Sequence, residues 1–398
     1  MAKILFLMWP EKGHLNSSLK IAKTLKSRGH TVIYSQPFEF EEYVRTQGFE
    51  FTPFFPEVFP KGCPIHQDYS VPLHVELPVF LSQVAARQQR TALDLLKEEM
   101  NNVLGTVQPE LLIMDAWMTR SMIPALPPRR PRCILLNPTL TDPYDETTFS
   151  YVSDMTTLIL CPEEFELPRT PKLPQYRYVE ASCDVHRKEK PGFPWDRIDE
   201  SKKLVYCALG LQSHWSHEGA DLESKQQNIK KFLQAVISAL STRTECQLVM
   251  AMGNYLRAED FHSVPTDAVL VNEAPQMAIL NKAYLAITHG GLNSVKECIF
   301  FGVPMIVFPV VGDQLGNAAR VAFHRIGVAG NIRTATAESI RSLLAKVESD
   351  PGFKTRAVTM MEAFHKAERE ERAVTLIEQC LAGQLHVPHA LGQRSGTT

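Results

Sequence analysis

The sequence predicts an α/β protein built from two doubly wound domains, each a parallel sheet with helices on both faces. Three observations lead to this fold class. The chain has 398 residues, a length that suits two or three domains rather than one. Short apolar runs alternate with helical patterns up to residue 140, and the same alternation restarts at residue 203. Between these halves the pattern dissolves into proline-rich and charged sequence.

The first half carries strand-like apolar runs separated by helical patterns. The expected strands lie at 3–9, 31–35, 49–54, 111–115 and 133–137. The expected helices lie between them, at 16–28, 39–46 and 75–104. Because strands that alternate with helices pair in parallel, these elements form one doubly wound domain, which we expect to span residues 1–195. Residues 141–203 are expected to be loops and a linker, with a boundary near 184–202.

The second half repeats this alternation. Its expected strands are the apolar runs KLVYCAL, QLVMAM, AVLVN, LAITH, PMIVFP and GVAG. Helices are expected within 222–240, at 291–301, at 314–325 and over most of the chain from 336 onward. We expect a second domain at 203–370, and a C-terminal helix and tail at 371–398 that pack back on the first domain. The two domains then face each other across a cleft.

Composition and charge exclude several functions. Lys and Arg total 42 and Asp and Glu total 44, so the net charge of −2 gives no support for binding a nucleic-acid backbone. The longest apolar run, at 299–311, is interrupted by glycine and proline, so no membrane span is predicted. The eight cysteines include no CxxC pair, and we expect reduced thiols of a cytoplasmic protein rather than a disulfide frame or a zinc site.

His14 lies in the loop that follows the first expected strand. Ligands of open parallel sheets bind beyond the carboxyl ends of the strands, which directs attention to this loop. Gly13 is expected to allow a tight turn and Asn16 to cap the next helix, so that His14 stands at the mouth of the cleft. An imidazole there can accept a proton near neutral pH. The alternative is an exposed loop histidine without a catalytic role.

Asp115 closes the expected strand at 111–115. An acidic residue at this place is often the cap of the following helix. Alternatively, its carboxylate orients the His14 imidazole and stabilises the cation that forms when the ring takes up a proton. Sequence separation does not show whether the two side chains meet, so both interpretations stay open.

The segment 273–320 contains a series of polar residues at strand ends and helix starts. His289, Gly290 and Gly291 follow the run LAIT, and Asn293 and Ser294 open the next helix. Backbone amides exposed by paired glycines at a helix start form an anion site that suits a diphosphate. A glycine turn without a ligand is the alternative for these glycines taken alone.

Three later residues of this segment suit sugar hydroxyls. Glu297 lies one turn after Asn293 on the same helix, where its carboxylate can accept hydrogen bonds from a ribose. Asp313 and Gln314 follow the run PMIVFP and offer a carboxylate and an amide to a second sugar. The ordered series is more specific than any one of its members.

This segment resembles the donor-binding signature of the nucleotide-sugar-dependent glycosyltransferases that include the UDP-glucuronosyltransferases, plant natural-product glucosyltransferases and bacterial macrolide glycosyltransferases. The resemblance is carried by Pro275, Gln276, His289, Gly290, Gly291, Asn293, Ser294, Glu297, Gly302, Val303, Pro304, Pro309, Asp313, Gln314 and Asn317. It implies a GT-B fold, with C-terminal helices that cross back to the first domain, and inverting transfer of a sugar from a nucleotide diphosphate to an acceptor.

The resemblance also implies a role for each matching residue. The family's general base matches His14, and its orienting acid matches Asp115. The diphosphate would lie at His289 and the amides near Gly291, Asn293 and Ser294, with Gln276 also on the donor side, the ribose at Glu297, and the sugar at Asp313 and Gln314. Since the chain has no strand-associated DxD motif, we expect no metal and no cofactor. The resemblance implies a UDP-sugar as the donor, and Asp313 with Gln314 suits a hexose with several hydroxyls, such as glucose.

Two positions depart from the family pattern. Glu273 stands where many relatives carry a tryptophan that stacks on uracil, and a carboxylate does not supply that stacking, so the nucleobase stays open. Relatives also place a small hydroxyl residue after the glycine that ends the first strand of the second domain. Here Gly210 is followed by Leu211, and Ser213 is the candidate replacement at the phosphate.

The acceptor is expected to bind the first domain. Residues 38–59 contain seven of the twenty phenylalanines, which suits a lipophilic hydroxyl acceptor unless these side chains form the core. Two other functions fit the same architecture. One is a nucleotide-sugar 2-epimerase, and the other is a non-catalytic nucleotide-sugar-binding protein.

Overall fold

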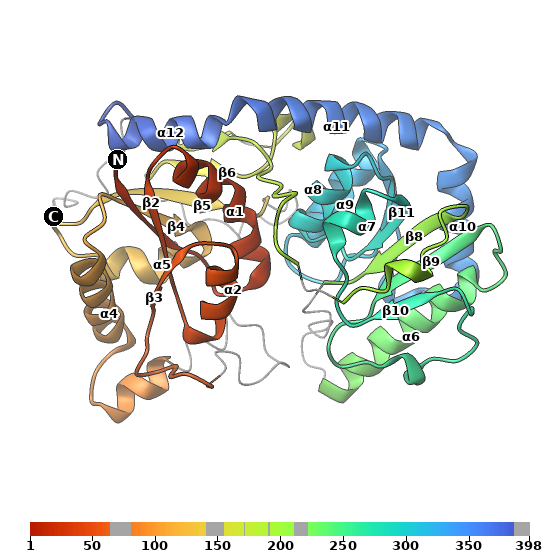
Figure 1. The fold of residues 1–398 in the computed structure, drawn as a ribbon, viewed down its shortest axis with the longest axis horizontal. Coiled ribbons are helices and arrows are strands. Elements are labelled where there is room, and N and C mark those ends of the chain that lie inside the picture. Colours follow the sequence, from red (N-terminus) through yellow and green to blue (C-terminus); the bar gives the residue numbers. More distant parts are fainter. Residues whose placement is uncertain (64–80, 141–154, 171, 190–191, 211–221, 386–398) are drawn as a thin grey trace, which may run out of the picture.

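The computed structural model describes residues 1–63, 81–140, 155–170, 172–189, 192–210 and 222–385. Within this part of the chain, two all-parallel sheets form separate domains that lie side by side (Figure 1). The first sheet has seven strands in the order β3-β2-β1-β4-β5-β6-β7, and the second has six in the order β10-β9-β8-β11-β12-β13. The predicted fold class of two doubly wound α/β domains is confirmed.

The elements of the first domain follow the sequence pattern closely. Its strands are β1 (Lys3–Leu7), β2 (Thr31–Gln36), β3 (Glu50–Pro53), β4 (Leu111–Asp115), β5 (Arg132–Asn137), β6 (Thr157–Ile159) and β7 (Tyr176–Tyr178). Its α-helices are α1 (Lys12–Ser27), α2 (Glu41–Thr46), α4 (Ala92–Val107) and α5 (Thr119–Met122). Strands β1 and β4 are almost entirely buried, as expected for parallel strands covered by helices on both faces.

The second domain has the same build. Its strands are β8 (Lys203–Ala208), β9 (Cys246–Ala251), β10 (Val269–Val271), β11 (Ala283–Thr288), β12 (Met305–Val307) and β13 (Gly327–Ala329). Its helices are α6 (Leu222–Leu240), α7 (Gln276–Leu280), α8 (Leu292–Phe300), α9 (Gln314–Phe323) and α10 (Ala337–Ser349). Two helices, α11 (Gly352–Glu370) and α12 (Arg372–Leu381), complete the described chain.

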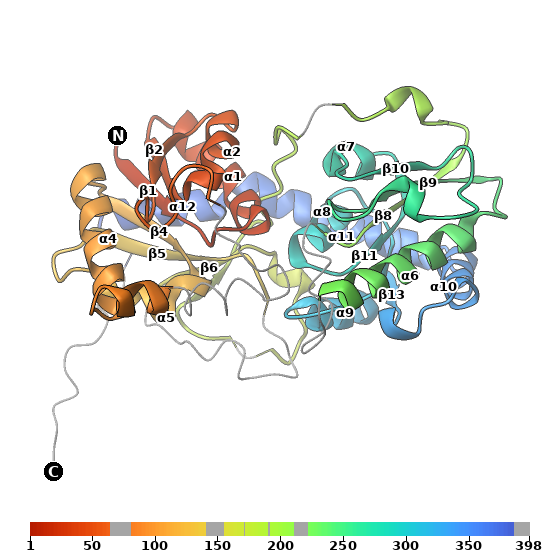
Figure 2. The same cartoon turned by 90° about the horizontal axis from the view of Figure 1, so that it is seen from below.

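The last two helices join the domains. Helix α11 packs on α8 of the second domain, and α12 packs on α1 and β5 of the first. Glu371, in the left-handed conformation with φ of 46°, separates the two helices. Both views show α11 lying along the second domain and α12 lying along the first (Figures 1 and 2). The predicted crossing of the C-terminal helices back to the first domain is therefore confirmed.

Three local predictions were wrong. Residues 141–203 were expected to be loops and a linker, yet they supply β6 and β7, which extend the first sheet beyond β5. The expected helix at 75–104 is interrupted. Gln89 has a φ of 55°, and Thr91 starts α4 with a capping box to Asp94, while 75–80 lies outside the described residues. Helix α1 begins at Lys12 rather than at residue 16.

The strand orders identify where a ligand binds. In each sheet the order in which successive strands are added reverses between two central strands. These are β1 and β4 in the first sheet and β8 and β11 in the second. Ligands of open parallel sheets bind outside the carboxyl ends of the strands at such a switch point. In the first sheet, His14 follows β1 and Asp115 is the last residue of β4. In the second sheet, Gly210 follows β8 and His289 follows β11.

Candidate active site

The first switch point holds a buried histidine and carboxylate in contact. His14 Nδ1 and Asp115 Oδ2 lie 2.7 Å apart. The Asp115 side chain is fully buried, and His14 is 8% exposed. Asp115 makes both of the contacts that the sequence allows, one to the start of the next helix and one to His14. Asp115 Oδ1 accepts a hydrogen bond from the Trp117 backbone at 2.9 Å, while Oδ2 faces the imidazole.

Electrostatics and packing prepare His14 for proton uptake. Burial disfavours the charged ring, but the adjacent Asp115 carboxylate outweighs that effect and raises the pKa of His14 above 6.5. Trp117 packs edge-on against the imidazole, with ring centroids 5.0 Å apart, and its own Nε1 donates to Thr139 Oγ1 at 3.1 Å. Since Asp115 engages Nδ1, the second nitrogen, Nε2, is the one left for a substrate proton.

Two neighbours of His14 have roles other than those predicted. Asn16 does not cap α1, because the helix starts four residues earlier with Glu11 as its N-cap, and Asn16 Oδ1 instead accepts a hydrogen bond from the Tyr43 hydroxyl. Gly13 lies within the first turn of the helix rather than in a tight turn before it. Its carbonyl oxygen accepts a hydrogen bond from Asn293 Nδ2 of the second domain at 2.6 Å.

The second switch point packs a histidine between glycines. Gly210 has a φ of 79°, and a Cβ atom there would lie 3.0 Å from the His289 ring. A Cβ atom at Gly291 would lie 2.6 Å from His289 Nε2. Both positions therefore require glycine if the ring is to stay in place. Burial lowers the pKa of His289 to about 4, so the imidazole is neutral at physiological pH.

The start of α8 lies beside this histidine. Gly291 is its N-cap and provides no side-chain hydrogen bond. The Leu292 backbone N–H donates to the Asp313 carboxylate, so the amides that follow it in the first turn are the ones that suit an anion. Asn293 and Ser294 are in this first turn, as predicted. The carbonyl oxygen of Gly290 accepts a hydrogen bond from the buried Asn317 Nδ2 at 2.9 Å, which ties the His289 loop to α9.

The two predicted sugar-binding residues stand at the start of α9. Burial raises the pKa of Asp313 to about 6, against the opposing effect of a 2.9 Å hydrogen bond from Asn317 Nδ2. Gln314 Oε1 accepts hydrogen bonds from the Val310 and Val311 backbone at 2.8 and 3.0 Å. Only the amide nitrogen of Gln314 is then left for a ligand. The side chain can therefore donate a hydrogen bond to a sugar hydroxyl but has no free oxygen with which to accept one.

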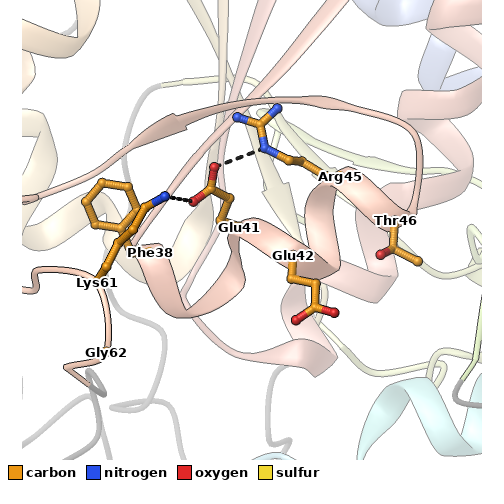
Figure 3. Close-up of a pocket in the computed structure, with 7 residues that line it drawn as sticks. All are labelled: Phe38, Glu41, Glu42, Arg45, Thr46, Lys61 and Gly62. Carbon is orange, nitrogen blue, oxygen red and sulfur yellow. Dashed lines mark hydrogen bonds and ion pairs between the residues drawn. The ribbon is translucent and has the colours of Figure 1, made fainter.

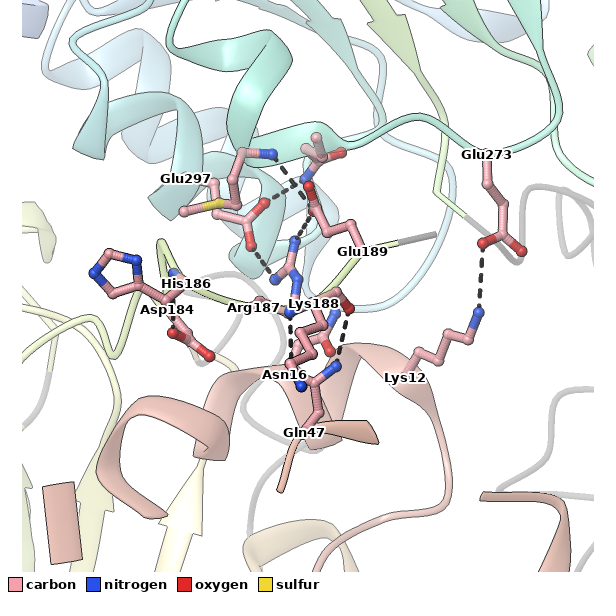
Figure 4. Close-up of polar contacts among 12 residues, drawn as sticks. Lys12, Asn16, Gln47, Asp184, His186, Arg187, Lys188, Glu189, Glu273 and Glu297 are labelled. Carbon is pink, nitrogen blue, oxygen red and sulfur yellow. Dashed lines mark hydrogen bonds and ion pairs between the residues drawn. The ribbon is translucent and has the colours of Figure 1, made fainter. Parts of the chain in front are cut away.

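Gln276 and Glu297 are joined directly. Gln276 Nε2 donates to Glu297 Oε2 at 2.5 Å, and the Tyr206 hydroxyl donates to Gln276 Oε1 at 3.2 Å. Arg187 holds the other oxygen of Glu297 at 2.8 Å (Figure 4). Arg187 is not recognisable from the sequence, because nothing in its charged surroundings distinguishes it from a solvated linker residue.

Contacts between the domains bring the two switch points face to face. Besides the Asn293 to Gly13 hydrogen bond, Lys12 forms an ion pair with Glu273 at 3.5 Å. The charge of Asp313 also contributes to the raised pKa of His14. Ser213, the predicted residue at the phosphate, lies outside the described residues.

The aromatic segment of the first domain is largely core. The buried phenylalanines are Phe40, Phe49, Phe54, Phe55 and Phe59. Phe38 borders an open hollow of about 680 Å³ together with Glu41, Arg45 and Lys61 (Figure 3). Glu41 pairs with Arg45 at 3.0 Å and with Lys61 at 3.1 Å, so the wall of this hollow is charged. The core alternative therefore holds for most of these side chains.

The described residues offer neither a metal site nor a membrane-spanning helix. Among them, no three His, Cys, Asp or Glu side chains group in a way that can hold a metal ion. No helix in the same part of the chain is long and apolar enough to cross a membrane.

The chain is similar to known glycosyltransferases. The family model described as UDP-glucoronosyl and UDP-glucosyl transferase matches residues 255–382. The NDP-glycosyltransferase YjiC of Bacillus licheniformis is 24% identical over 94% of this chain and 96% of its own length. The oleandomycin glycosyltransferase of Streptomyces antibioticus is 27% identical over 60% of this chain and 52% of its own length.

Solved structures share the two-domain fold. The glycotransferase of kitacinnamycin superimposes with a TM-score of 0.70 at 20% identity, covering 95% of this chain and 98% of that protein. The spinosyn rhamnosyltransferase SpnG superimposes with a TM-score of 0.68 at 18% identity, covering 94% and 100%. The solved structures show that the chain has the GT-B fold. The family model and the relatives support its assignment to the nucleotide-sugar-dependent glycosyltransferases that include the UDP-glucuronosyltransferases and the bacterial macrolide glycosyltransferases.

Proposed function

We propose that this glycosyltransferase moves a hexose, with glucose as the first choice, from UDP to a hydroxyl group of a lipophilic small molecule, with inversion at the anomeric carbon. The observation that carries the proposal is the 2.7 Å contact between His14 and Asp115, opposite the anion site at the start of α8. A natural-product acceptor is supported by the names of relatives, which include an oleandomycin and a zeaxanthin glycosyltransferase.

His14 acts as the general base. Its Nε2 takes the proton of the acceptor hydroxyl while the hydroxyl oxygen forms a bond to the anomeric carbon. On the opposite face, the bond between that carbon and the diphosphate oxygen breaks, and the nucleotide leaves with the electron pair. The imidazolium that forms is stabilised by the Asp115 carboxylate.

In the proposed reaction, groups of the second domain stabilise the leaving diphosphate, and no metal ion takes part. The backbone N–H groups at the start of α8, which is the positive end of the helix dipole, stabilise the negative charge that develops on the diphosphate. The neutral His289 imidazole, fixed between Gly210 and Gly291, adds a hydrogen-bonding group. Two structural neighbours are complexed with thymidine diphosphate, which makes a thymidine diphosphate sugar the second choice of donor.

Replacing His14 tests the proposal. His14→Ala is expected to lower kcat by about 10³-fold or more, because the base and the site of the transferred proton are lost, while the Kd for UDP changes little. Product formation by chromatography and UDP binding by calorimetry are the two measurements. His262→Ala, at an exposed histidine of the second domain, is the matched control and should keep full activity.

Two results would contradict this proposal. Unchanged transfer in His14→Ala would remove the role of this residue. Isomerisation of a UDP-N-acetylhexosamine in the absence of any acceptor would instead identify the chain as a nucleotide-sugar 2-epimerase.

A further inference from the structure

The linker between the two sheets places a buried arginine on the expected ribose carboxylate. Arg187 Nη1 lies 2.8 Å from Glu297 Oε1, and Arg187 Nη2 lies 2.8 Å from Glu189 Oε1 (Figure 4). The side chains of Arg187 and Glu297 are 8% and 7% exposed. Although burial opposes its charge, the two carboxylates raise the pKa of Arg187 above its ordinary value. The guanidinium therefore stays charged, and its two Nη atoms bind two different carboxylates.

Glu297 is held at both of its oxygens. Arg187 occupies one hydrogen-bond site on Oε1, and Gln276 Nε2 occupies one on Oε2 at 2.5 Å. A carboxylate offers about four lone-pair sites in total, two on each oxygen. Each oxygen of Glu297 thus keeps one site for a further donor, which matches the two hydroxyl groups of a ribose.

The backbone that carries Arg187 is fixed to the first domain. Gln47 makes two hydrogen bonds with the Lys188 backbone, accepting from its N–H at 3.1 Å and donating to its carbonyl at 2.9 Å. Lys23 pairs with Asp184 at 2.5 Å. The backbone is therefore anchored on both sides of Arg187, so that the guanidinium reaches Glu297 from a fixed stretch of chain.

We propose that Arg187 is a positioning residue, which fixes the Glu297 carboxylate so that its remaining sites accept the ribose hydroxyls of the donor. The inference rests on the proposed function and extends it to a residue outside the donor segment. Without Arg187, Glu297 and Glu189 would face each other in a buried place without a cation between them, and such an arrangement is unfavourable. Glu297 would then turn away, and the hydroxyls would lose their acceptor.

A thermodynamic cycle that combines a change in the protein with a change in the ligand tests this role. The Kd values of UDP and of 2′,3′-dideoxy-UDP are measured by calorimetry for the wild type and for Arg187→Met. We expect the wild type to prefer UDP by roughly tenfold or more, since a hydrogen bond to a charged group contributes at least this much. In Arg187→Met the preference should fall to about onefold, with the affinity for the dideoxy nucleotide nearly unchanged.

Two further variants serve as controls. Arg187→Lys keeps the charge but not the fork, so its preference should be intermediate, and it keeps the test informative if Arg187→Met does not fold. Arg243→Met removes another partly buried arginine of the second domain, which pairs with Glu245 and Glu348. It should keep the wild-type preference. In steady-state kinetics, Arg187→Met should raise KM for the donor and leave KM for the acceptor unchanged.

The outcomes separate this inference from the proposed function. No UDP binding by the wild type would overturn both. A wild type that prefers UDP, together with an Arg187→Met variant that keeps the same preference, would overturn the role of Arg187 alone. Tighter binding of UDP by Arg187→Met would also overturn it, because Arg187 would then compete with the ribose instead of positioning its acceptor.

Discussion

The switch points of the two sheets each carry one histidine, and the residue beside it differs. In the first domain, His14 after β1 meets the carboxylate that ends β4. In the second domain, His289 after β11 meets Gly210 after β8. The pKa of His14 is raised because Asp115 outweighs its burial, whereas burial alone lowers the pKa of His289 to about 4. The two environments thus suit the two proposed roles, a base in the first domain and a neutral hydrogen-bonding group in the second.

The largest effect that follows from this difference concerns the partner of His14. Asp115→Asn keeps the shape of the side chain and removes its charge, so the imidazolium loses its stabilisation and kcat should fall by roughly 10²- to 10⁴-fold. The structure also predicts the pH dependence. The base works when neutral, so kcat/KM rises with pH through the raised pKa of His14, above 6.5. In Asp115→Asn this limb should move to lower pH.

Asp313 gives the control for that profile. Its pKa is raised to about 6, so it titrates close to the same limb. Asp313→Asn should leave the limb due to His14 in place, shifted slightly to lower pH because the charge of Asp313 contributes to the raised pKa. If the limb vanished in Asp313→Asn and persisted unshifted in Asp115→Asn, the assignment of the base would be wrong.

An intermediate effect is expected at the second switch point. Gly291→Ala places a Cβ atom 2.6 Å from His289 Nε2, so the ring must move from its place beside the start of α8. The Kd for UDP should rise by about tenfold, the equivalent of one charge-assisted hydrogen bond. Calorimetry measures it directly.

A second glycine provides the matched control. Gly105 lies in α4 with no atom within 4 Å of an added Cβ. Gly105→Ala should raise the free energy of unfolding by up to about 1 kcal/mol through helix propensity and leave UDP binding unchanged. Equal UDP affinity in Gly291→Ala and the wild type would show that His289 does not contact the nucleotide.

The smallest effect on kcat/KM is expected at a partly exposed ion pair between the two domains. Lys12→Met removes the 3.5 Å pair with Glu273. Partly exposed pairs contribute about 0–1 kcal/mol, so kcat/KM should change less than about fivefold. Lys282→Met, which breaks a pair with Glu200 within the second half of the chain, is the comparison. A loss of roughly a hundredfold in Lys12→Met alone would indicate that Lys12 contacts a substrate, beyond the effect of a surface pair.

Much of the fold, and the places of the candidate site residues at its strand ends, could be predicted from the sequence. The central strands are apolar and buried on both faces, so their runs are visible without any alignment, and the site residues follow them directly. Strands β6 and β7 were missed because each has only three residues and depends on pairing with the neighbouring strand. The start of α1 was missed because its N-cap, Glu11, uses no side-chain hydrogen bond.

Contacts over long sequence separations could not be predicted. The sequence contains His14 and Asp115 but not their 2.7 Å contact, which arises because β1 and β4 are neighbours in the sheet. Arg187 stands in a charged stretch typical of a linker, and only the folded chain brings it to Glu297, 110 residues further on. Opposite pKa shifts of two histidines likewise depend on the tertiary environment alone.

The central claim is that the two histidines are prepared for opposite roles, and an NMR titration of the histidine ring nitrogens tests it most directly. His14→Gln and His289→Gln assign the two resonances. The structure predicts that His14 titrates with a midpoint above 6.5, which falls in Asp115→Asn, while His289 stays neutral down to about pH 5, one unit above its pKa of about 4. Protonation of His289 near neutral pH, or a midpoint of His14 below 6.5, would contradict this account.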